Sequence, residues 1–366
     1  MRQLPLAEWH QRAGARFVPF AGYDMPLQFQ GVMAEHQAVR HAVGLFDISH
    51  MGRFLLSGSR VREQLDALVP TSLASLAPGQ SQYTVLLTPQ GTILDDVIAY
   101  CLRDDQWLLI VNGARRQVDW DWVSSHSEGS SVQDETDSHI LLAIQGSQAV
   151  PMVEMMVQEP LADLKRFQHR WVTLRDPAAT RMFAARTGYT GEDGLEVIVP
   201  VDVGAWLWQQ ALELGIPPCG LGCRDTLRLE AAMHLYGQDM DTTTTPWEAG
   251  LGWLVHSDQG DFVGREALLR QKEQGIPRQF VGLQMLGKEI ARPGYALFAH
   301  PTDPVSIGQI TSGTKSPTLG IPIALGYVPP AWATVGTTLW VDVRGQRVSA
   351  QVVKRPFYRS PHLAPR

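Results

Sequence analysis

The chain has 366 residues, a length that predicts two or three domains rather than one. Hydrophobic residues make up 44% of it and charged residues 19%, which allows a sizeable core and argues against long disordered segments. The net charge of −6 argues against nucleic-acid binding, and no apolar stretch is long enough to span a membrane.

The first two thirds of the chain mix helices and strands. Residues 33–43 predict a helix, with Gly44 as its C-cap. A second helix is expected over residues 201–214 and a third over 225–235, with Asp225 as the N-cap of the third. Strands are expected at residues 45–49, 53–56, 83–87, 93–102, 107–111 and 141–144.

The last third has a different pattern, in which short alternating strands are separated by Gly and Pro. This pattern predicts a small antiparallel barrel as a separate domain. We place the boundary before it in the polar stretch 270–275. The expected strands are residues 281–285, 307–311, 323–328, 339–343 and 349–353.

Two adjacent carboxylates, Asp95 and Asp96, interrupt the apolar strand at 93–102. Neighbouring residues on a strand point to opposite faces, so one of the two side chains is directed to where a strand normally buries apolar groups. A buried carboxylate is costly unless it is paired or has a chemical task. The pair is therefore the first candidate for a functional site.

Glu196 interrupts a second apolar strand, directly after the glycine-rich stretch 186–194. A carboxylate there could hold a planar donor pair, such as the edge of a guanidine-like heterocycle, through two charge-assisted hydrogen bonds. A carboxylate at a sheet edge or in a structural ion pair is equally compatible with the pattern.

Arg224 lies in the run Gly220-Leu-Gly-Cys-Arg-Asp225, near an expected helix start. It could bind the carboxylate of a ligand, although a structural pairing with Asp225 or Glu230 is favoured on local grounds. The run lacks the third glycine and the Lys-Ser/Thr of a phosphate loop, so no nucleotide site is expected.

Other reactive side chains give weaker signals. His36 and His50 fit structural roles better than catalytic ones. Cys219 and Cys223 have no second metal-binding pair near them, so no metal is expected. The N-terminus lacks the apolar core of a signal peptide, and three cysteines do not suggest a disulfide framework. We therefore expect a soluble, cytoplasmic enzyme or binding protein.

Taken together, the motifs run in one order along nearly the whole chain. In that order they resemble the aminomethyltransferase (T-protein) family of the glycine cleavage system. The matching segments are Phe20-Ala-Gly-Tyr-Asp-Met-Pro26, Glu35-His-Gln-Ala-Val-Arg40, Gly44-Leu-Phe-Asp-Ile-Ser-His-Met-Gly52, 91–96, Leu142-Ala-Ile-Gln-Gly146, 186–196, 220–237, Glu248-Ala-Gly-Leu-Gly-Trp253 and 311–320.

The resemblance implies an α+β fold with three domains in a cloverleaf-like arrangement, a central folate cavity and a C-terminal antiparallel β-barrel. The expected domains are residues 1–48 plus 140–270, 49–139, and 276–366. The implied reaction moves the one-carbon unit from the aminomethylated lipoyl group of the H-protein to tetrahydrofolate. Its products are 5,10-methylenetetrahydrofolate, ammonia and the dihydrolipoyl carrier, and it needs no metal or nucleotide.

The resemblance also assigns roles to residues. Asp96 matches the catalytic aspartate, Glu196 the glutamate at the pterin edge and Arg224 a folate-contacting arginine. Arg359 resembles a basic residue near the glutamate tail of the folate. Tyr83, Asn112 and Tyr189 match positions that line the cavity, where a packing role is the alternative. Thr92 replaces a common glycine and could shift Asp96 slightly.

Two other functions share this fold. A stand-alone folate-dependent demethylase is expected to diverge around His50 and the glycine-rich stretch. A non-enzymatic folate-binding factor for iron–sulfur assembly carries a Lys-Gly-Cys-aromatic-x-Gly-Gln motif, and this sequence contains no such run. The aminomethyltransferase interpretation is therefore preferred.

Overall fold

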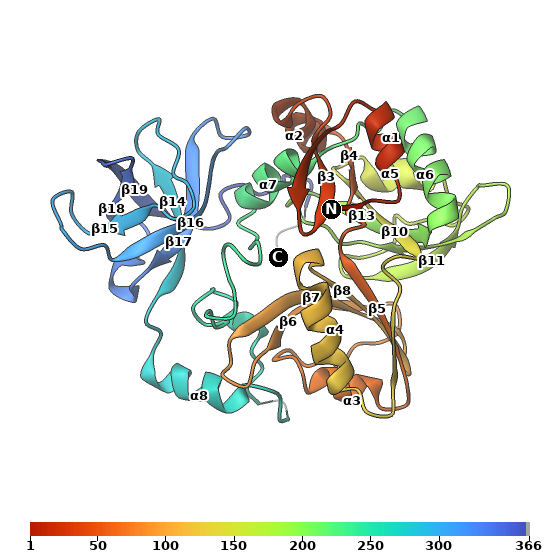
Figure 1. Cartoon of the computed structure of the whole chain (residues 1–366), viewed down its shortest axis with the longest axis horizontal. Coiled ribbons are helices and arrows are strands. Elements are labelled where there is room, and N and C mark those ends of the chain that lie inside the picture. The colour runs from red at the N-terminus through yellow and green to blue at the C-terminus, as the bar shows by residue number, and fades with distance from the viewer. Residues whose placement is uncertain (259, 364–366) are drawn as a thin grey trace.

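The computed structural model describes residues 1–258 and 260–363 of the chain. A three-stranded sheet, two five-stranded sheets and a closed barrel form three lobes around a common centre (Figure 1). The expected α+β class, the cloverleaf-like arrangement and the C-terminal barrel are confirmed. Across the described part of the chain, every helix is too short or too polar to cross a bilayer.

The first lobe is built on a five-stranded antiparallel sheet. Helices α5 and α6 cover one face, where Val199 and Trp208 belong to a large apolar core. In sheet order the strands are β11 (His169–Thr173), β12 (Arg181–Ala185), β13 (Gly194–Pro200), β10 (His139–Gln145) and β4 (Gly44–Asp47). The helices of this lobe are α1 (Ala7–Arg12), α2 (Val32–His41), α5 (Ala149–Glu154), α6 (Val201–Glu213) and α7 (Leu221–Glu230).

A small sheet precedes α2 in the same lobe, with strands β1 (Arg2–Gln3), β3 (Tyr23–Gln28) and β2 (Arg16–Phe20). Strand β3 packs against α7. The larger sheet takes strands from both sides of residues 49–139, since β4 comes before them and β10 starts where they end. We therefore propose, as expected, that the first domain combines residues 1–48 with a segment beginning near 140.

The second lobe is another five-stranded antiparallel sheet. Helices α3 (Val61–Asp66) and α4 (Arg116–Ser125) contribute Leu65 and Val123 to its core. Its strands, in sheet order, are β6 (Ser81–Leu87), β7 (Ile93–Arg103), β8 (Gln106–Val111), β5 (Gly52–Ser57) and β9 (Ser131–Asp134). Because all five strands fall between residues 52 and 134, we propose that residues 49–139 form this domain.

The third lobe is a closed six-stranded barrel, in which β14 pairs with both β17 and β19. Five of its strands match the expected ones, and short β15 was missed. The strands, in barrel order, are β14 (Gln279–Met285), β17 (Pro322–Val328), β16 (Gly308–Lys315), β15 (Ala296–Phe298), β18 (Thr338–Val343) and β19 (Gln346–Val353). Short 3₁₀ turns lie at Gly113–Arg115, Gly252–Leu254 and Pro330–Trp332.

The stretch 270–275, expected to hold the domain boundary, is mostly helical. Helix α8 spans Arg265–Gln274 and ends at Gly275, whose φ of +85° suits glycine. Leu268 of this helix packs with Val85 and Leu87 of the second lobe. We propose that the barrel domain starts at residue 276, as expected.

Two predicted helix ends were wrong. Ala42, not Gly44, ends α2, and Gly44 is the first residue of β4. A Cβ at position 44 would lie 2.5 Å from the Val39 side chain and 2.7 Å from the Cys219 sulfur, so close packing requires this glycine. Helix α7 starts at Leu221 with Gly220 as its N-cap.

Asp225 is therefore inside α7. Its carboxylate pairs with the Arg228 guanidinium, one turn later, at 2.7 Å. Nearby residues three apart on a helix attract in this way, and the pairing removes Asp225 from any capping role.

Candidate active site

A cavity of about 1630 Å³ lies where the three lobes meet. The second lobe contributes strands β6–β8, the first lobe contributes α7 and the 187–191 turn, and the barrel contributes parts of β14 and β19. All seven residues predicted for the site line this cavity, namely Tyr83, Asp96, Asn112, Tyr189, Glu196, Arg224 and Arg359. The fold thus brings together side chains that lie up to 276 positions apart in the sequence (83 to 359).

Asp96 is half-buried on β7 and faces the cavity, as predicted. The Tyr83 hydroxyl donates to its Oδ2 at 3.1 Å, and the Asn112 side-chain amide donates to its Oδ1 at 2.8 Å. Burial and the neighbouring Asp95 raise the pKa of Asp96, and the two hydrogen bonds lower it. The net result is a pKa of about 7. A cation placed beside this carboxylate would keep it ionised.

Asp95 points the other way, is fully buried and does not line the cavity. It accepts two hydrogen bonds from Asn112, both at 2.9 Å, one from the backbone and one from the side chain. The same amide nitrogen also bonds Asp96, so Asn112 joins the two carboxyl groups. The expected divergence of the two aspartates is confirmed.

Asp119, which was not predicted, lies on α4 and acts on Asp95. Burial and the Asp119 carboxyl raise the pKa of Asp95 well above its ordinary value, and burial raises the pKa of Asp119 to about 7. Asp95 therefore favours its neutral form beside Asp119, because ionising both buried carboxyl groups is costly. The available signal was its spacing, since Asp119 and buried Val123 are four residues apart on one helix face.

The turn before β7 contains Thr92, the departure from the family pattern that could move Asp96. The Thr92 hydroxyl shares a 2.7 Å hydrogen bond with that of Thr88, and the Thr92 backbone N–H also bonds the Thr88 hydroxyl at 3.3 Å. Gly91 between them has a φ of +76° and a close neighbour in Leu268. Thr92 thus tightens the turn that leads into the strand of Asp96.

Glu196 is buried on β13, which lies inside its sheet between β12 and β10. The sheet-edge alternative is therefore wrong, and Glu196 forms no ion pair within residues 1–258 and 260–363. The Thr187 hydroxyl donates to its Oε2 at 2.5 Å. Burial raises the pKa of Glu196, and the Thr187 bond and the charge of Arg224 oppose that rise. Its other oxygen is available to a ligand's donors.

Arg224 of α7 places its guanidinium over the Tyr189 ring, 4.6 Å from the centroid. Its Nη1 is buried and has no hydrogen-bond partner in the described structure. The structural alternatives are wrong, because Asp225 pairs with Arg228 and Glu230 pairs with Arg40. A buried, unbonded guanidinium nitrogen beside a cavity fits the binding of an oxygen ligand.

Tyr189 donates its hydroxyl to the backbone carbonyl of His234. The ring is therefore fixed as a wall of the cavity, and only its face and edge are open to a ligand. Arg359 is exposed and lies in the C-terminal segment that lines the cavity. It is the least enclosed of the predicted site residues.

His50 also lines the cavity, although the sequence favoured a structural role. It is buried and its Nδ1 has no hydrogen-bond partner in the part of the chain described. Burial and the charge of Arg224 lower its pKa to about 3, so the imidazole is neutral. Trp253 was not singled out; it is 57% exposed, lines the cavity and stacks on Tyr83 with a centroid distance of 6.3 Å.

Glu35, Cys219 and Cys223 bring three possible metal ligands within 4.8 Å of one another. The Glu35 carboxylate is already used, since it accepts backbone N–H bonds from Gly220 at 2.8 Å and from residues 29, 30 and 31. Burial raises the pKa of the Cys223 thiol well above its usual value, which disfavours the thiolate that binds metals. The cluster is structural and does not suit a metal.

Comparison with known proteins gives a consistent result. The model described as "GCVT N-terminal domain" matches residues 6–259, and "Glycine cleavage T-protein C-terminal barrel domain" matches 278–359. The aminomethyltransferase of Thermosynechococcus vestitus is 52% identical over 99% of this chain and 96% of its own, and that of Prochlorococcus marinus (strain MIT 9303) is 51% identical over both full lengths.

A solved structure, the glycine cleavage system aminomethyltransferase T from Bartonella henselae, is also similar. It has a TM-score of 0.91 and 35% sequence identity, and the match covers 98% of each chain. The two family models together span the first two lobes and the barrel. The chain belongs to the glycine cleavage T-protein family of aminomethyltransferases.

Proposed function

We propose that this aminomethyltransferase takes its one-carbon unit from the lipoyl group of the glycine cleavage H-protein and delivers it to tetrahydrofolate. One observation carries the proposal: Asp96, Glu196 and Arg224 line a single cavity. The products would be 5,10-methylenetetrahydrofolate, ammonia and the dihydrolipoyl carrier.

The lining of the cavity suits a reduced folate. The pterin presents adjacent N–H donors, and the Glu196 carboxylate is a buried acceptor that could receive them as charge-assisted bonds. Tyr189 supplies an aromatic wall, and Arg224 supplies donors for a pterin or tail oxygen. Arg359, in the exposed C-terminal segment, is suited to a carboxylate of the glutamate tail.

In the reaction the carbon–sulfur bond breaks with its electron pair going to sulfur, and N5 of tetrahydrofolate bonds to the carbon. Ammonia then leaves and N10 closes the five-membered ring. The two N–H protons of tetrahydrofolate end on the lipoyl sulfur and on ammonia, so the atoms balance. Cleavage of the carbon–sulfur bond and departure of ammonia each leave a positive, iminium-like carbon, one before and one after the N5-aminomethyl adduct.

Asp96 is placed to stabilise that charge. Its carboxylate has a pKa near 7 in a buried setting, so the approach of a cation lowers the pKa and fixes the ionised form. Tyr83 and Asn112 hold its two oxygens in place. A preorganised negative charge of this kind acts on the transition state without reorganisation of solvent.

We also propose a cytoplasmic location. All three cysteines are buried and unbridged, as expected in a reducing compartment.

The test is ammonia release from aminomethylated H-protein, with and without tetrahydrofolate. We expect rapid release only when tetrahydrofolate is present, together with an equal amount of 5,10-methylenetetrahydrofolate. Release that is independent of folate would contradict the proposed acceptor. Transfer from free methylated amines instead would favour the demethylase alternative.

A further inference from the structure

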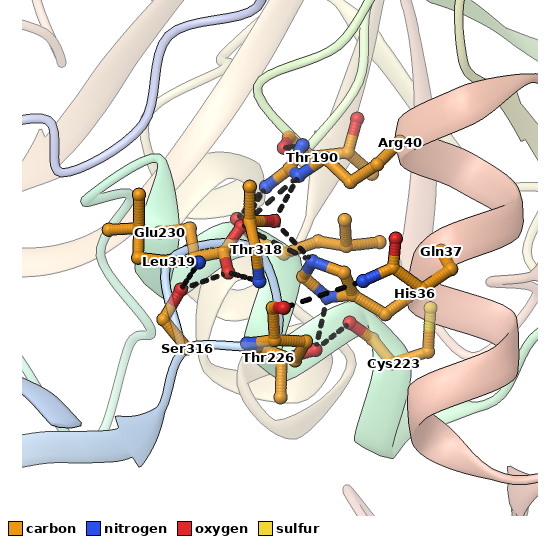
Figure 2. Close-up of polar contacts among 12 residues, drawn as sticks. His36, Gln37, Arg40, Thr190, Cys223, Thr226, Glu230, Ser316, Thr318 and Leu319 are labelled. Carbon is orange, nitrogen blue, oxygen red and sulfur yellow. Dashed lines mark hydrogen bonds and ion pairs between the residues drawn. The ribbon is translucent and has the colours of Figure 1, made fainter. Parts of the chain in front are cut away.

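Arg40 of α2 is a buried cation that lies behind the cavity wall, and Figure 2 shows it at one edge of a network of contacts around Glu230 and Thr318. Its Nη2 and Nε bond Glu230 Oε2 at 2.7 and 3.1 Å, and its Nη1 bonds Glu192 Oε1 at 2.8 Å. All three charged side chains are buried, yet none of them lines the cavity. The cluster therefore has no direct contact with a ligand there.

Three further contacts of Arg40 reach the elements that form separate walls of the cavity. Its Nη1 donates to the carbonyl of Thr190 at 2.8 Å, next to Tyr189 in the chain. Its Nη2 donates to the carbonyl of Leu227 at 3.3 Å, one helical turn from Arg224. Its guanidinium also lies 4.1 Å from the centroid of the Tyr358 ring, the residue before Arg359.

Glu230, the carboxylate partner of Arg40, contacts the C-terminal segment and the barrel. The Tyr358 backbone N–H donates to the carbonyl of Glu230 at 2.9 Å, which fixes the C-terminal segment on the end of α7. The Thr318 hydroxyl of the barrel donates to Glu230 Oε2 at 2.7 Å and lies 2.9 Å from His36 Nε2. Figure 2 shows Ser316 and Thr318 facing Glu230 from the barrel side.

We propose that Arg40 is a positioning residue for the folate site. It holds Tyr189, Arg224 and Arg359 in register from behind and so sets the affinity for tetrahydrofolate without touching it. The inference rests on the proposed function, because these three residues were assigned to folate. The planar guanidinium of Arg40 contacts all three walls from one position. No described residue of the cavity wall contacts Thr190, Leu227 and Tyr358 together.

Lysine cannot replace that fork. An ammonium group could keep the ion pair with Glu230, but it has no planar set of donors to reach Thr190 and Leu227 together, and its contact with Tyr358 is weaker. The charge balance of the buried cluster is preserved in Arg40→Lys, so the variant removes the hydrogen bonds to Thr190 and Leu227 but keeps the positive charge.

The test measures tetrahydrofolate dissociation constants and steady-state kinetics for the full chain and for Arg40→Lys. We expect the dissociation constant and KM for tetrahydrofolate to rise about tenfold, the loss of one or two net hydrogen bonds. The kcat at saturating tetrahydrofolate should stay within about twofold, as for loss of ground-state binding. An unchanged dissociation constant in folded Arg40→Lys would overturn the inference.

Arg347→Lys is the matched control. Arg347 also pairs with a carboxylate, Asp342, and lies over an aromatic ring, Phe298, but in the barrel and away from the cavity. We expect this variant to lower the melting temperature without altering tetrahydrofolate binding. A similar rise in the dissociation constant for both variants would indicate a general loss of structure and would also overturn the inference.

If Arg40→Lys does not fold, Thr318→Val is the variant that tests the positioning role of Arg40. Thr318 is exposed, so loss of its hydroxyl leaves the core intact while it weakens Glu230 and the 3.3 Å bond with Arg40 Nε. About a threefold rise in the tetrahydrofolate dissociation constant supports the inference, and no change refutes it. Wild-type protein that fails to bind tetrahydrofolate would instead refute the proposed function, so the two failures can be told apart.

Discussion

Asp96 is held between opposing influences. Desolvation and the nearby Asp95 favour its neutral form, while the Tyr83 hydroxyl and the Asn112 amide favour its carboxylate. The result is a group with a pKa of about 7, whose charge is sensitive to whatever enters the cavity. If the carboxylate is the active form, kcat/KM rises with pH through this range, because the group must lose its proton first.

Tyr83→Phe tests how much the Tyr83 hydroxyl contributes to the pKa of Asp96. It removes a hydrogen bond to the carboxylate and keeps the ring that stacks on Trp253. The pKa of Asp96 should rise, so the acid limb of the kcat/KM profile moves to higher pH by about 0.5–1. Above pH 9 the variant should approach wild-type activity. An acid limb that does not move would show that the Tyr83 hydroxyl does not affect the pKa of Asp96.

Glu196→Gln changes one proposed acceptor of the pterin into a donor. The Thr187 bond can be retained, since the amide oxygen still accepts it. Loss of a charge-assisted bond predicts tetrahydrofolate binding that is about 10–100-fold weaker. Equilibrium titration of the folded variant measures this directly, and unchanged affinity would remove Glu196 from the site.

At the scale of elements, β7 and α4 meet through the buried carboxyl groups of Asp95 and Asp119. The folded-state pKa of Asp119 is about 7 against 3.8 for the unconstrained side chain. The cost of ionising it in the folded state is therefore absent below pH 4, grows between pH 4 and pH 7, and is complete above that range. This contact destabilises the protein at high pH and not at low pH.

Asp119→Asn should relieve that cost. We expect the free energy of unfolding to rise by about 1–3 kcal/mol at pH 8 and to change little at pH 4. Chemical denaturation at the two pH values measures the difference. Asp121→Asn, an exposed change on the same helix, is the control and should show no such pH dependence. A gain of equal size at pH 4 would show that charge is not the cause.

The elements also show where local sequence patterns suffice. Strand β7 was predicted almost to the residue, because its apolar run is bounded by turns on both sides. The predicted start of helix α7 was four residues too late, because Asp225 resembles a cap and pairs with Arg228 only once the fold places it there. Asp119 was missed for the same reason, since its partner is 24 positions away (95 to 119) and on another element.

The cavity belongs to the whole molecule rather than to any one lobe. Tyr83 and Asp96 come from the second lobe, Glu196 and Arg224 from the first, and Phe280 from the barrel. Family motifs predicted seven of the lining residues, whereas the Arg40 cluster meets the barrel through Thr318, a contact between lobes that no local pattern contains. Function at this site therefore requires the lobes to be held together.

Leu229 is one of the residues that hold them. This α7 side chain is fully buried among Phe280, Ile323, Leu325 and Tyr327 of the barrel. Leu229→Ala should lower the free energy of unfolding by about 2–5 kcal/mol, the usual cost of such a cavity. It should also weaken tetrahydrofolate binding, because Phe280 lines the site.

Urea unfolding measures that loss of stability. Leu286→Ala is a matched control, since Leu286 is 53% exposed on the barrel and its removal should cost less than about 0.5 kcal/mol. Equal effects of the two changes would contradict the packing role given to Leu229.

We propose above all that the charge of Asp96 stabilises the transferring carbon. The most direct measurement pairs tetrahydrofolate binding with formation of 5,10-methylenetetrahydrofolate from aminomethylated H-protein, in wild-type protein and in Asp96→Asn. We expect near-normal binding and a fall in transfer of roughly 10²–10⁴-fold, because an amide keeps the shape of the side chain and loses its charge. Near-normal transfer by the folded variant would show that the charge of Asp96 does not stabilise the transferring carbon.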